Sequence, residues 1–474
     1  MAENGRRRRL LVAIASFGEK NLSFLNRIIR QYRSLDLDVE IVVVSEAPKH
    51  LDGVEKVVVG LPSSNPWSLP FAHKKIFAEN VERFDLFAYS EDDIEVTQRN
   101  IDAFLGVTGE LKVDEIAGFL RYELSQTGDR FLPDCHGHYH WDPNSVRQRG
   151  PYSIAEFTNE HAAFYLLTQP QLKRAIASGG FLREPYEGRY DMLCTAATDP
   201  YVACGFRKVI CICPLEDFLV HHMSNRYAGV LGLYLASFQE QVETLRKISN
   251  NLHPASALCE VESKASHREW SKSYYEEPSR ELFKMVPSDA TTILSIGCGW
   301  GAVEAELARR GASVTALPLD SVIGAFAEKR NLEMIYGSLN ECFDRLNGRK
   351  FDCVFITDLI HLQPDPKRII RELLRFVQGN GTVVIGGPNF QSAPLILKRL
   401  LRIRGLERLH DYSVSGIQPF APRDYLSELR SAGFEVNAVH WYDYVQNPPA
   451  LRVIAPRLGS VAAKRWIMRV RRSS

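Results

Sequence analysis

A short apolar run that ends directly in acidic residues most constrains how this chain folds. Residues 84–89 are short, aromatic-rich and bounded by charge, which is typical of a buried strand, and Ser90-Glu91-Asp92-Asp93 follow at once. Three carboxylates packed at a strand end repel one another unless a cation neutralises them, and Mg²⁺ and Mn²⁺ prefer oxygen ligands. Such a metal can also stabilise a departing diphosphate. The alternative is a solvated acidic turn.

Length and composition limit the class of protein. A chain of 474 residues is too long for one ordinary core, so two or three domains are expected, and 45% hydrophobic with 24% charged residues indicates a globular protein. A net charge of +1 argues against a nucleic-acid or other general polyanion binder. Nine scattered cysteines predict reduced thiols and a cytoplasmic location. No apolar run reaches the length of a membrane span.

Strands and helices alternate through the first half of the chain. Strands are expected over 10–15, 39–44 and 54–59, and helices over 22–35 and 73–81. This rhythm predicts an α/β fold with a mostly parallel sheet. Because ligands of such sheets bind beyond the carboxyl ends of the strands, the acidic run lies where a ligand site is expected.

On these residues, the stretch from about 8 to 230 resembles a glycosyltransferase of the GT-A fold, within a first domain predicted over 8–250. Glu91-Asp92-Asp93 stands where that fold carries its Asp-x-Asp signature, with Glu in place of the first Asp. The resemblance implies a nucleotide-sugar donor and a Mn²⁺ or Mg²⁺ ion. It implies that Asp93 ligates the metal and that Glu91 or Asp92 helps to hold the ribose or the ion.

The resemblance also suggests further site residues. Inverting GT-A enzymes use a carboxylate as base for the acceptor hydroxyl, so Glu160, Asp191 and Asp199 are candidates. Asp199 could instead cap a helix, and Asp191 could form a structural ion pair. In many such enzymes a late histidine completes the metal shell; His221 or His222 could do so, and His221 is favoured. Lys74 is a candidate for the diphosphate, although a place on a helix surface is the alternative.

A cysteine- and histidine-rich stretch offers a competing metal site. Residues 135–140 and the pair Cys211 and Cys213 contain soft ligands from which a zinc site could be built. Their spacing matches no standard zinc motif. We therefore interpret residues 135–140 as an active-site loop.

A second domain is expected after an amphipathic helix over 229–250 and a linker over 251–275. Within this domain, predicted over 276–456, an apolar strand at 292–296 ends in Gly297, Gly299 and Gly301 and a helix follows. Glycines at such a strand end let a ligand approach the backbone, and the start of the helix offers free N–H groups. The third glycine comes earlier than in the dinucleotide-binding fingerprint.

Further strands are expected over 313–317, 335–339, 351–358 and 382–386. With them, residues 285–445 resemble a class I S-adenosylmethionine-dependent methyltransferase with a Rossmann-like fold. The resemblance implies that the three glycines line the cofactor and that Ser338 and Leu339 lie near its adenine. It also implies that Asp358 and His361 face the methyl acceptor, with His361 a candidate general base.

Two departures from the family pattern concern the cofactor. The family places an acid two residues before the first glycine, where this chain has Ser295, and another at the end of the second strand, where it has Pro318. Asp320 could take over the second role. Otherwise the domain would bind the cofactor weakly or serve as a scaffold.

Two basic stretches contain interleaved apolar residues. The stretch 395–410 and the tail 457–474, interpreted as amphipathic, could lie on an anionic membrane surface. The alternative is that they cover the sheet of the second domain.

Together these features predict a bifunctional cytoplasmic enzyme, at the inner face of the membrane if the basic stretches bind lipid. The first domain would transfer a sugar and the second would methylate a hydroxyl of the glycan or glycolipid acceptor, as in surface polysaccharide synthesis. Fusion would raise the effective concentration of one product at the next site. The alternatives are a glycosyltransferase with a degenerate methyltransferase domain and a non-catalytic glycan- or nucleotide-binding assembly protein.

Overall fold

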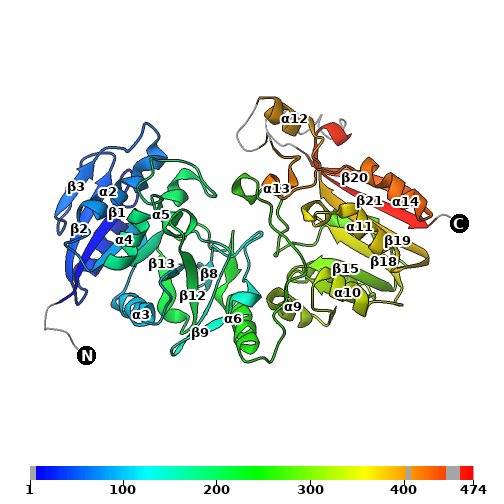
Figure 1. Ribbon diagram of the computed structural model, residues 1–474, viewed down its shortest axis with the longest axis horizontal. Coiled ribbons are helices and arrows are strands. Elements are labelled where there is room, and N and C mark those ends of the chain that lie inside the picture. The colour runs from blue at the N-terminus through cyan, green and yellow to red at the C-terminus, as the bar shows by residue number, and fades with distance from the viewer. Residues whose placement is uncertain (1–6, 402–405, 407, 445–458, 473–474) are drawn as a thin grey trace. The chain divides into compact units, whose positions relative to one another are not determined.

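A computed structural model describes residues 7–401, 406, 408–444 and 459–472. The chain divides into two compact units, Met1–Asn250 and Asn251–Ser474, each with its own sheets and core (Figure 1). Among the described residues, no helix is both long and apolar enough to cross a bilayer.

The first unit is built on the mostly parallel sheet that the sequence predicts. Its strands are β1 (Arg9–Ala15), β2 (Asp38–Ser45), β3 (Lys56–Val59), β4 (Leu86–Glu91) and β11 (Phe164–Thr168), in the order β11-β4-β1-β2-β3. The strands β1 to β4 are parallel and β11 is antiparallel to β4. The chain moves from β1 to β3 on one side and returns to add β4 on the other. Such a switch point is where α/β sheets bind ligands.

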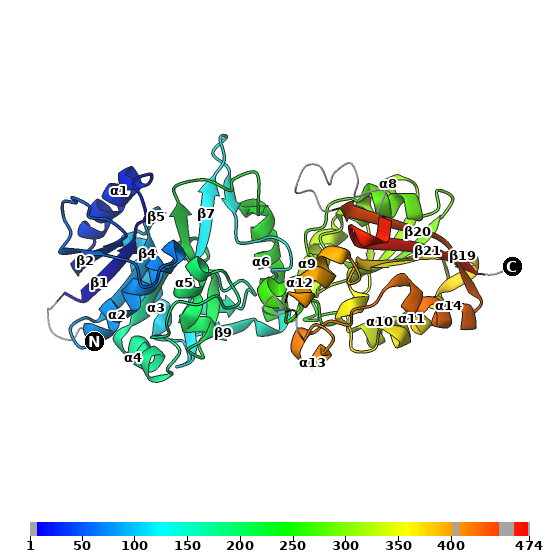
Figure 2. The same ribbon diagram turned by 90° about the horizontal axis from the view of Figure 1, so that it is seen from above.

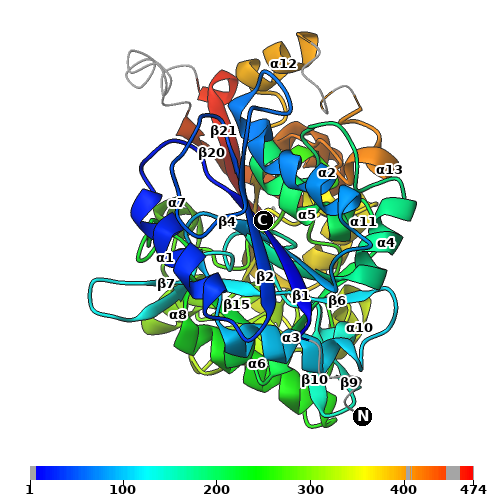
Figure 3. The ribbon, with the colours of Figure 1, turned by 90° about the vertical axis from the view of Figure 1, so that its left-hand side faces the viewer.

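Helices cover both faces of this sheet. The helix α1 (Leu22–Arg33) buries Leu25, Ile28, Ile29 and Tyr32, which recur at helical spacing and pack in the main core. Figure 3 shows α1 and α2 (Ala72–Glu79) on opposite sides of β1 and β2. The other helices of this unit are α3 (Gln98–Thr108), α4 (Gln169–Ala177), α5 (Met192–Val202) and α6 (Leu235–Ser249).

Two smaller sheets extend the first unit. One contains β6 (Glu115–Ala117), β12 (Arg207–Cys213), β10 (Tyr152–Ala155) and β9 (Arg147–Arg149). The other contains β14 (Leu233–Tyr234), β8 (Arg130–Leu132), β7 (Leu120–Leu124), β13 (Leu219–His222) and β5 (Ile94–Glu95). Because β13 pairs with β5, and the Met223 amide donates to the Asp93 carbonyl at 2.8 Å, the late histidines lie beside the acidic run.

The second unit is a seven-stranded sheet in the order β17-β16-β15-β18-β19-β21-β20. Its strands are β15 (Thr292–Cys298), β16 (Ser313–Pro318), β17 (Glu333–Met334), β18 (Phe351–Thr357), β19 (Val377–Pro388), β20 (Phe434–Tyr444) and β21 (Ala463–Arg472). The first five are parallel, and β21 lies antiparallel between β19 and β20. The switch point lies between β15 and β18, so the three glycines at the carboxyl end of β15 stand at the expected ligand edge.

The two faces of this sheet pack in separate cores, as the period-2 alternation of strand side chains requires. Leu294 and Ile296 pack in one cluster and Ile293 in another. Figure 2 shows α10 (Leu339–Arg345), α11 (Pro366–Leu374) and α14 (Leu426–Ser431) on one side of the sheet and α8 (Ala302–Arg309) on the other. The remaining helices are α7 (Arg280–Met285), α9 (Ser321–Glu328), α12 (Ala393–Leu400) and α13 (Tyr412–Ser415).

Two sequence predictions about this unit are wrong. The basic tail is not a surface segment over its described part, because residues 463–472 form β21, with Trp466, Met468 and Val470 buried in the core. Hydrogen bonds from β19 and β20 on both sides fix this strand. The strand expected over 335–339 is also absent: β17 ends at Met334, and Ser338 caps α10 instead.

Candidate functional sites

The first unit contains a cavity of about 420 Å³ at the carboxyl ends of β1 and β4. Its lining includes the polar residues Asn21, Glu91, Asp92, Asp93, Arg121, His161, Asp191, His222 and Arg226. The acidic run is therefore part of a concave site. Asp92 is 7% exposed and Asp93 is 6% exposed, so the alternative of a solvated acidic turn is wrong.

Asp93 and His222 both line this cavity and contact each other. The His222 Nε2 atom lies 3.1 Å from Asp93 Oδ2, and its Nδ1 atom lies 2.5 Å from Glu123 Oε1. Burial by itself would lower the pKa of His222, but the hydrogen bonds to Asp93 and Glu123 outweigh it and raise the pKa to about 9. The two carboxylates, one at each ring nitrogen, fix the orientation of the imidazole.

The prediction that His221 ligates the metal is wrong. Its ring stacks on Tyr122 with centroids 4.9 Å apart, and its Nδ1 atom lies 3.7 Å from Glu95 Oε2. Successive side chains of a strand point to opposite faces, so only one of the two histidines of β13 can face Asp93. That residue is His222.

The other two acids of the run, Glu91 and Asp92, line the same cavity as Asp93. Burial and the neighbouring Asp93 raise the pKa of Glu91 to about 7. Asp92 accepts a hydrogen bond from Asn21 Nδ2 at 2.8 Å, and burial raises its pKa.

Over the described part of the chain, no group of three His, Cys, Asp or Glu side chains converges as a metal site. This result covers residues 135–140 and the cysteines of β12, where a zinc site was the competing interpretation.

Of the three candidate bases, Asp191 alone is among the residues that line the cavity. Its Oδ1 atom accepts the Cys194 amide at 2.9 Å and caps α5. Glu160 lies outside this lining, where Arg189 Nη1 approaches its Oε2 atom to 2.5 Å and the Tyr190 hydroxyl donates to it at 2.9 Å.

Asp199 and Lys74 are paired with each other in the core, and both predictions for them are wrong. The Lys74 ammonium contacts Asp199 Oδ2, and the Tyr186 hydroxyl donates to Asp199 Oδ1 at 2.6 Å. The side chains are 3% and 0% exposed. Asp199 lies inside α5 rather than at its cap, and Lys74 lies on the buried face of α2 rather than its surface.

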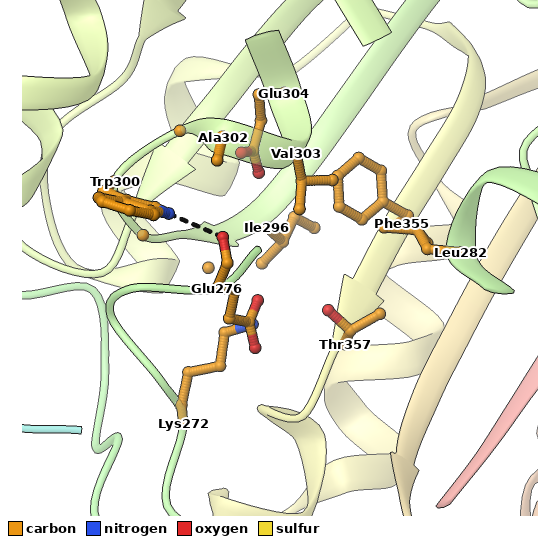
Figure 4. Close-up of a pocket in the computed structure, with 13 residues that line it drawn as sticks. Lys272, Glu276, Leu282, Ile296, Trp300, Ala302, Val303, Glu304, Phe355 and Thr357 are labelled. Atoms are coloured by element: carbon orange, nitrogen blue, oxygen red, sulfur yellow. Dashed lines mark hydrogen bonds and ion pairs between the residues drawn. The ribbon is translucent and has the colours of Figure 1, made fainter. Parts of the chain in front are cut away.

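In the second unit, Gly297, Gly299 and Gly301 lie in a short stretch that we call the glycine loop. The segment before β15 crosses this loop. A Cβ atom at Gly299 would lie 2.2 Å from the Tyr274 carbonyl oxygen, so only glycine permits this approach. The Trp300 amide donates to that oxygen at 2.9 Å, and Trp300 Nε1 donates to the Glu276 carbonyl at 2.7 Å (Figure 4). We call residues 270–276 the lead-in segment.

A narrow slot of about 10 Å³, room for about one water molecule, lies between the lead-in segment and the glycine loop. Its polar lining comes from Lys272, Glu276, Glu304 and Thr357, together with Gly297, Gly299 and Gly301. Lys272 Nζ lies 2.6 Å from Glu276 Oε2, and Lys272 is 1% exposed.

Sequence reasoning missed Glu304. The Ser295 hydroxyl donates to Glu304 Oε1 at 2.6 Å, so a carboxylate from α8 reaches the position where the family pattern has an acid on β15. Its signal in the sequence is an acid on the apolar face of the helix after the glycines, next to Val303 and one turn before Leu307.

Other predicted cofactor and acceptor residues lie outside the lining of the slot. Asp320 is buried, caps α9 through the Val322 and Ile323 amides, and hydrogen-bonds with the Tyr274 hydroxyl, so its ribose role stays a prediction. Ser338 caps α10, Leu339 is buried beside it, and Asp358 pairs with Arg465.

The general-base role predicted for His361 is wrong. His361 Nε2 donates to the Trp270 carbonyl at 2.7 Å, and the residue is 4% exposed. Burial lowers its pKa to about 4. His361 therefore holds the lead-in segment in place.

Comparison with known proteins gives a family match within the second unit. Residues 294–385 match the family model described as a methyltransferase domain. The chain thus carries a methyltransferase domain. This domain spans the glycine loop and β15 to β19.

The chain is also similar to curated relatives and to solved structures over part of its length. A ubiquinone biosynthesis O-methyltransferase of Pseudomonas entomophila (strain L48) is 26% identical over 191 residues, 37% of this chain and 81% of the relative. One from Pseudomonas paraeruginosa (strain DSM 24068 / PA7) is 28% identical over 158 residues, 31% of this chain and 66% of the relative. A SAM-dependent methyltransferase from Archaeoglobus fulgidus has a TM-score of 0.32 and 16% identity, with 41% of this chain and 90% of that chain covered.

The buried pair Lys74–Asp199 predicts a large loss of stability on Lys74→Met. Breaking a buried ion pair leaves one charge uncompensated and costs about 3–5 kcal/mol, because the desolvation penalty remains. The matched control is Lys75→Met on the same helix, where the side chain is 83% exposed. Thermal unfolding should show a clear fall in Tm for Lys74→Met only. Equal Tm values for the two variants would contradict the structural role.

Proposed function

We propose that the second unit transfers a methyl group from S-adenosylmethionine to an acceptor hydroxyl. The observation that supports this most is the glycine loop at the carboxyl end of β15, inside the matched residues 294–385 and at the switch point of the sheet. The relatives are named O-methyltransferases, which favours oxygen as the acceptor atom.

The residues around the slot fit this cofactor in their chemistry. The glycines allow a ligand to lie against the backbone, and the carboxylates of Glu276 and Glu304 suit its positive charges. S-adenosylmethionine supplies an electrophilic methyl group; the protein binds it, orients it and excludes water. Because the slot holds only about 10 Å³ and the Tyr274 carbonyl lies against Gly299, the lead-in segment with Lys272 and Glu276 must move aside to admit it.

Calorimetric titration with S-adenosylhomocysteine tests this proposal. We expect micromolar binding by the full chain, and loss of binding in Gly299→Ala, where the new Cβ would strike the Tyr274 carbonyl. Gly379→Ala is the control, because its Cβ position has no neighbour within 4 Å and its φ is not in the left-handed region. No heat up to millimolar ligand would leave the unit as a scaffold and would contradict the proposal.

For the first unit we propose glycosyl transfer from a nucleotide sugar with a divalent cation. Asp93 and His222, with Glu123 behind the ring, supply one carboxylate and one imidazole in the cavity at the ends of β1 and β4. Mg²⁺ is often held by only one or two protein ligands and completes its shell with substrate phosphates and water. A two-ligand site therefore suits Mn²⁺ or Mg²⁺ bound together with a diphosphate.

Within this proposal Asp191 is the base for the acceptor hydroxyl, since it lines the same cavity. The first unit would glycosylate a glycan or glycolipid and the second would methylate the product. Tethering both units in one chain raises the effective concentration of the intermediate. Synthesis of a surface polysaccharide or glycolipid would use this pair of reactions.

The metal assignment predicts that Asp93→Asn and His222→Gln lose Mn²⁺-dependent binding of nucleoside diphosphates. We expect at least a tenfold loss, about 1.4 kcal/mol, because each variant removes a ligand. The matched control is His221→Gln, which removes the neighbouring ring that faces Glu95. Calorimetry with UDP and GDP, with and without Mn²⁺, measures the effect. The assignment fails if His221→Gln is the variant that loses binding.

We also propose that α12 contacts an anionic membrane. Four aliphatic residues at its end are exposed, namely Ile396 (43%), Leu397 (56%), Leu400 (74%) and Leu401 (67%), and Lys398 and Arg399 stand among them. Apolar side chains next to basic ones suit the interface of an anionic bilayer. Of the predicted basic residues in the two basic stretches, Arg402, Arg404 and Arg457 lie outside the described residues.

Vesicle flotation tests the membrane proposal. The chain should float with vesicles of phosphatidylcholine and phosphatidylglycerol, and less with phosphatidylcholine alone, because the charge attraction is lost. Replacing Leu400 and Leu401 by Gln should abolish flotation, whereas Val113→Gln, an exposed aliphatic residue of the first unit, should not. Equal flotation of all variants would overturn the proposal.

A further inference from the structure

We propose that Glu304 receives the positively charged part of the methyl donor in the second unit. This inference rests on the methyltransferase function proposed above and assigns a particular residue to it. Glu304 lies in the first turn of α8 and lines the slot beside the glycine loop. Figure 4 shows Glu304 and Glu276 approaching the slot from opposite sides.

Glu304 is a buried carboxylate whose close partners are neutral. The residue is 4% exposed and accepts hydrogen bonds from the hydroxyl of Ser295 and the thiol of Cys298. Among the residues that the structure describes, no Lys, Arg or His nitrogen lies within 4 Å of its oxygens. Burial raises the pKa of Glu304, which is the effect of an incompletely compensated charge.

The cation nearest to this site has another partner. Lys272, also buried in the slot, lies 2.6 Å from Glu276 Oε2, so it acts on Glu304 only at longer range. The slot thus contains two carboxylates and one ammonium group. A ligand with one positive charge would balance it, and a buried charge is stable only when it is paired.

S-adenosylmethionine carries two positive groups, an ammonium and a sulfonium, and one carboxylate, so its net charge is +1. S-adenosylhomocysteine keeps only the ammonium group and the carboxylate. The Ser295 hydroxyl occupies one oxygen of Glu304 and fixes the carboxylate on the side of the glycine loop. The carboxylate also lines the slot, where a donor group of a ligand can approach it. Ser295 and Glu304 together therefore place a carboxylate where an acid on β15 itself would stand.

The competing explanation is that Glu304 only ties α8 to β15 through Ser295. Glu304→Gln separates the two, because glutamine keeps the shape and can accept the Ser295 hydrogen bond but has no charge. The control is Glu306→Gln on the same helix, whose side chain pairs with Arg309 and Arg310 and is not among the residues of the slot.

Calorimetry with both ligands, together with the Tm of the ligand-free chain, tests the proposal. We expect Glu304→Gln to bind at least tenfold more weakly with an unchanged or raised Tm, and Glu306→Gln to bind within twofold of the wild type. A loss for both ligands indicates contact with the ammonium group, and a loss for S-adenosylmethionine alone indicates contact with the sulfonium centre. In the double variant Ser295→Asp with Glu304→Ala, the acid returns to β15 and binding should recover.

Wild-type affinity in Glu304→Gln would overturn the inference and leave the methyltransferase proposal intact. A fall in Tm without a change in affinity would assign Glu304 to the structural tie and would also overturn it. If the wild-type chain binds neither ligand, the proposed function itself fails and this inference fails with it. The outcomes are therefore distinguishable.

Discussion

The placement of buried charge at the carboxyl ends of parallel strands determines both candidate sites. In each unit the chain adds strands on one side of the first strand and then returns to the other side, so neighbouring loops diverge at that edge. The acids after β4 and the glycines after β15 lie at these two points. A charge buried there needs either a partner from the protein or a ligand, and this requirement distinguishes structural pairs from sites.

Lys74–Asp199 and Asp93–His222 show the two outcomes of that requirement within one unit. Lys74 and Asp199 neutralise each other in the core, and the Tyr186 hydroxyl satisfies the remaining oxygen. Asp93 instead shares His222 with Glu123, and Glu91 and Asp92 beside it have raised pKa values. The core pair is therefore neutralised within the protein, whereas the cavity places carboxylates with raised pKa values beside His222, Arg121 and Arg226.

The sequence predicts what depends on local pattern and misses what depends on pairing between distant segments. Apolar runs locate β1, β2, β4 and β15, and the acidic run and the glycines follow directly from them. Choosing His222 over His221 requires the orientation of β13 against β5, which is not local. The tail becomes β21 because β19 and β20 flank it. The sequence does not predict the role of Glu304, because its partner Ser295 lies on another element.

Cofactor affinity in the second unit depends on the lead-in segment as well as on the glycine loop. The contacts of Tyr274 with Gly299 and of Lys272 with Glu276 close the slot. A ligand that enters must displace these contacts. Its apparent affinity is therefore the intrinsic affinity multiplied by the fraction of molecules whose slot is open. From buried positions, His361 holds Trp270 at the start of the same segment and Asp320 holds Tyr274 within it. Residues that never touch the ligand therefore influence how tightly it binds.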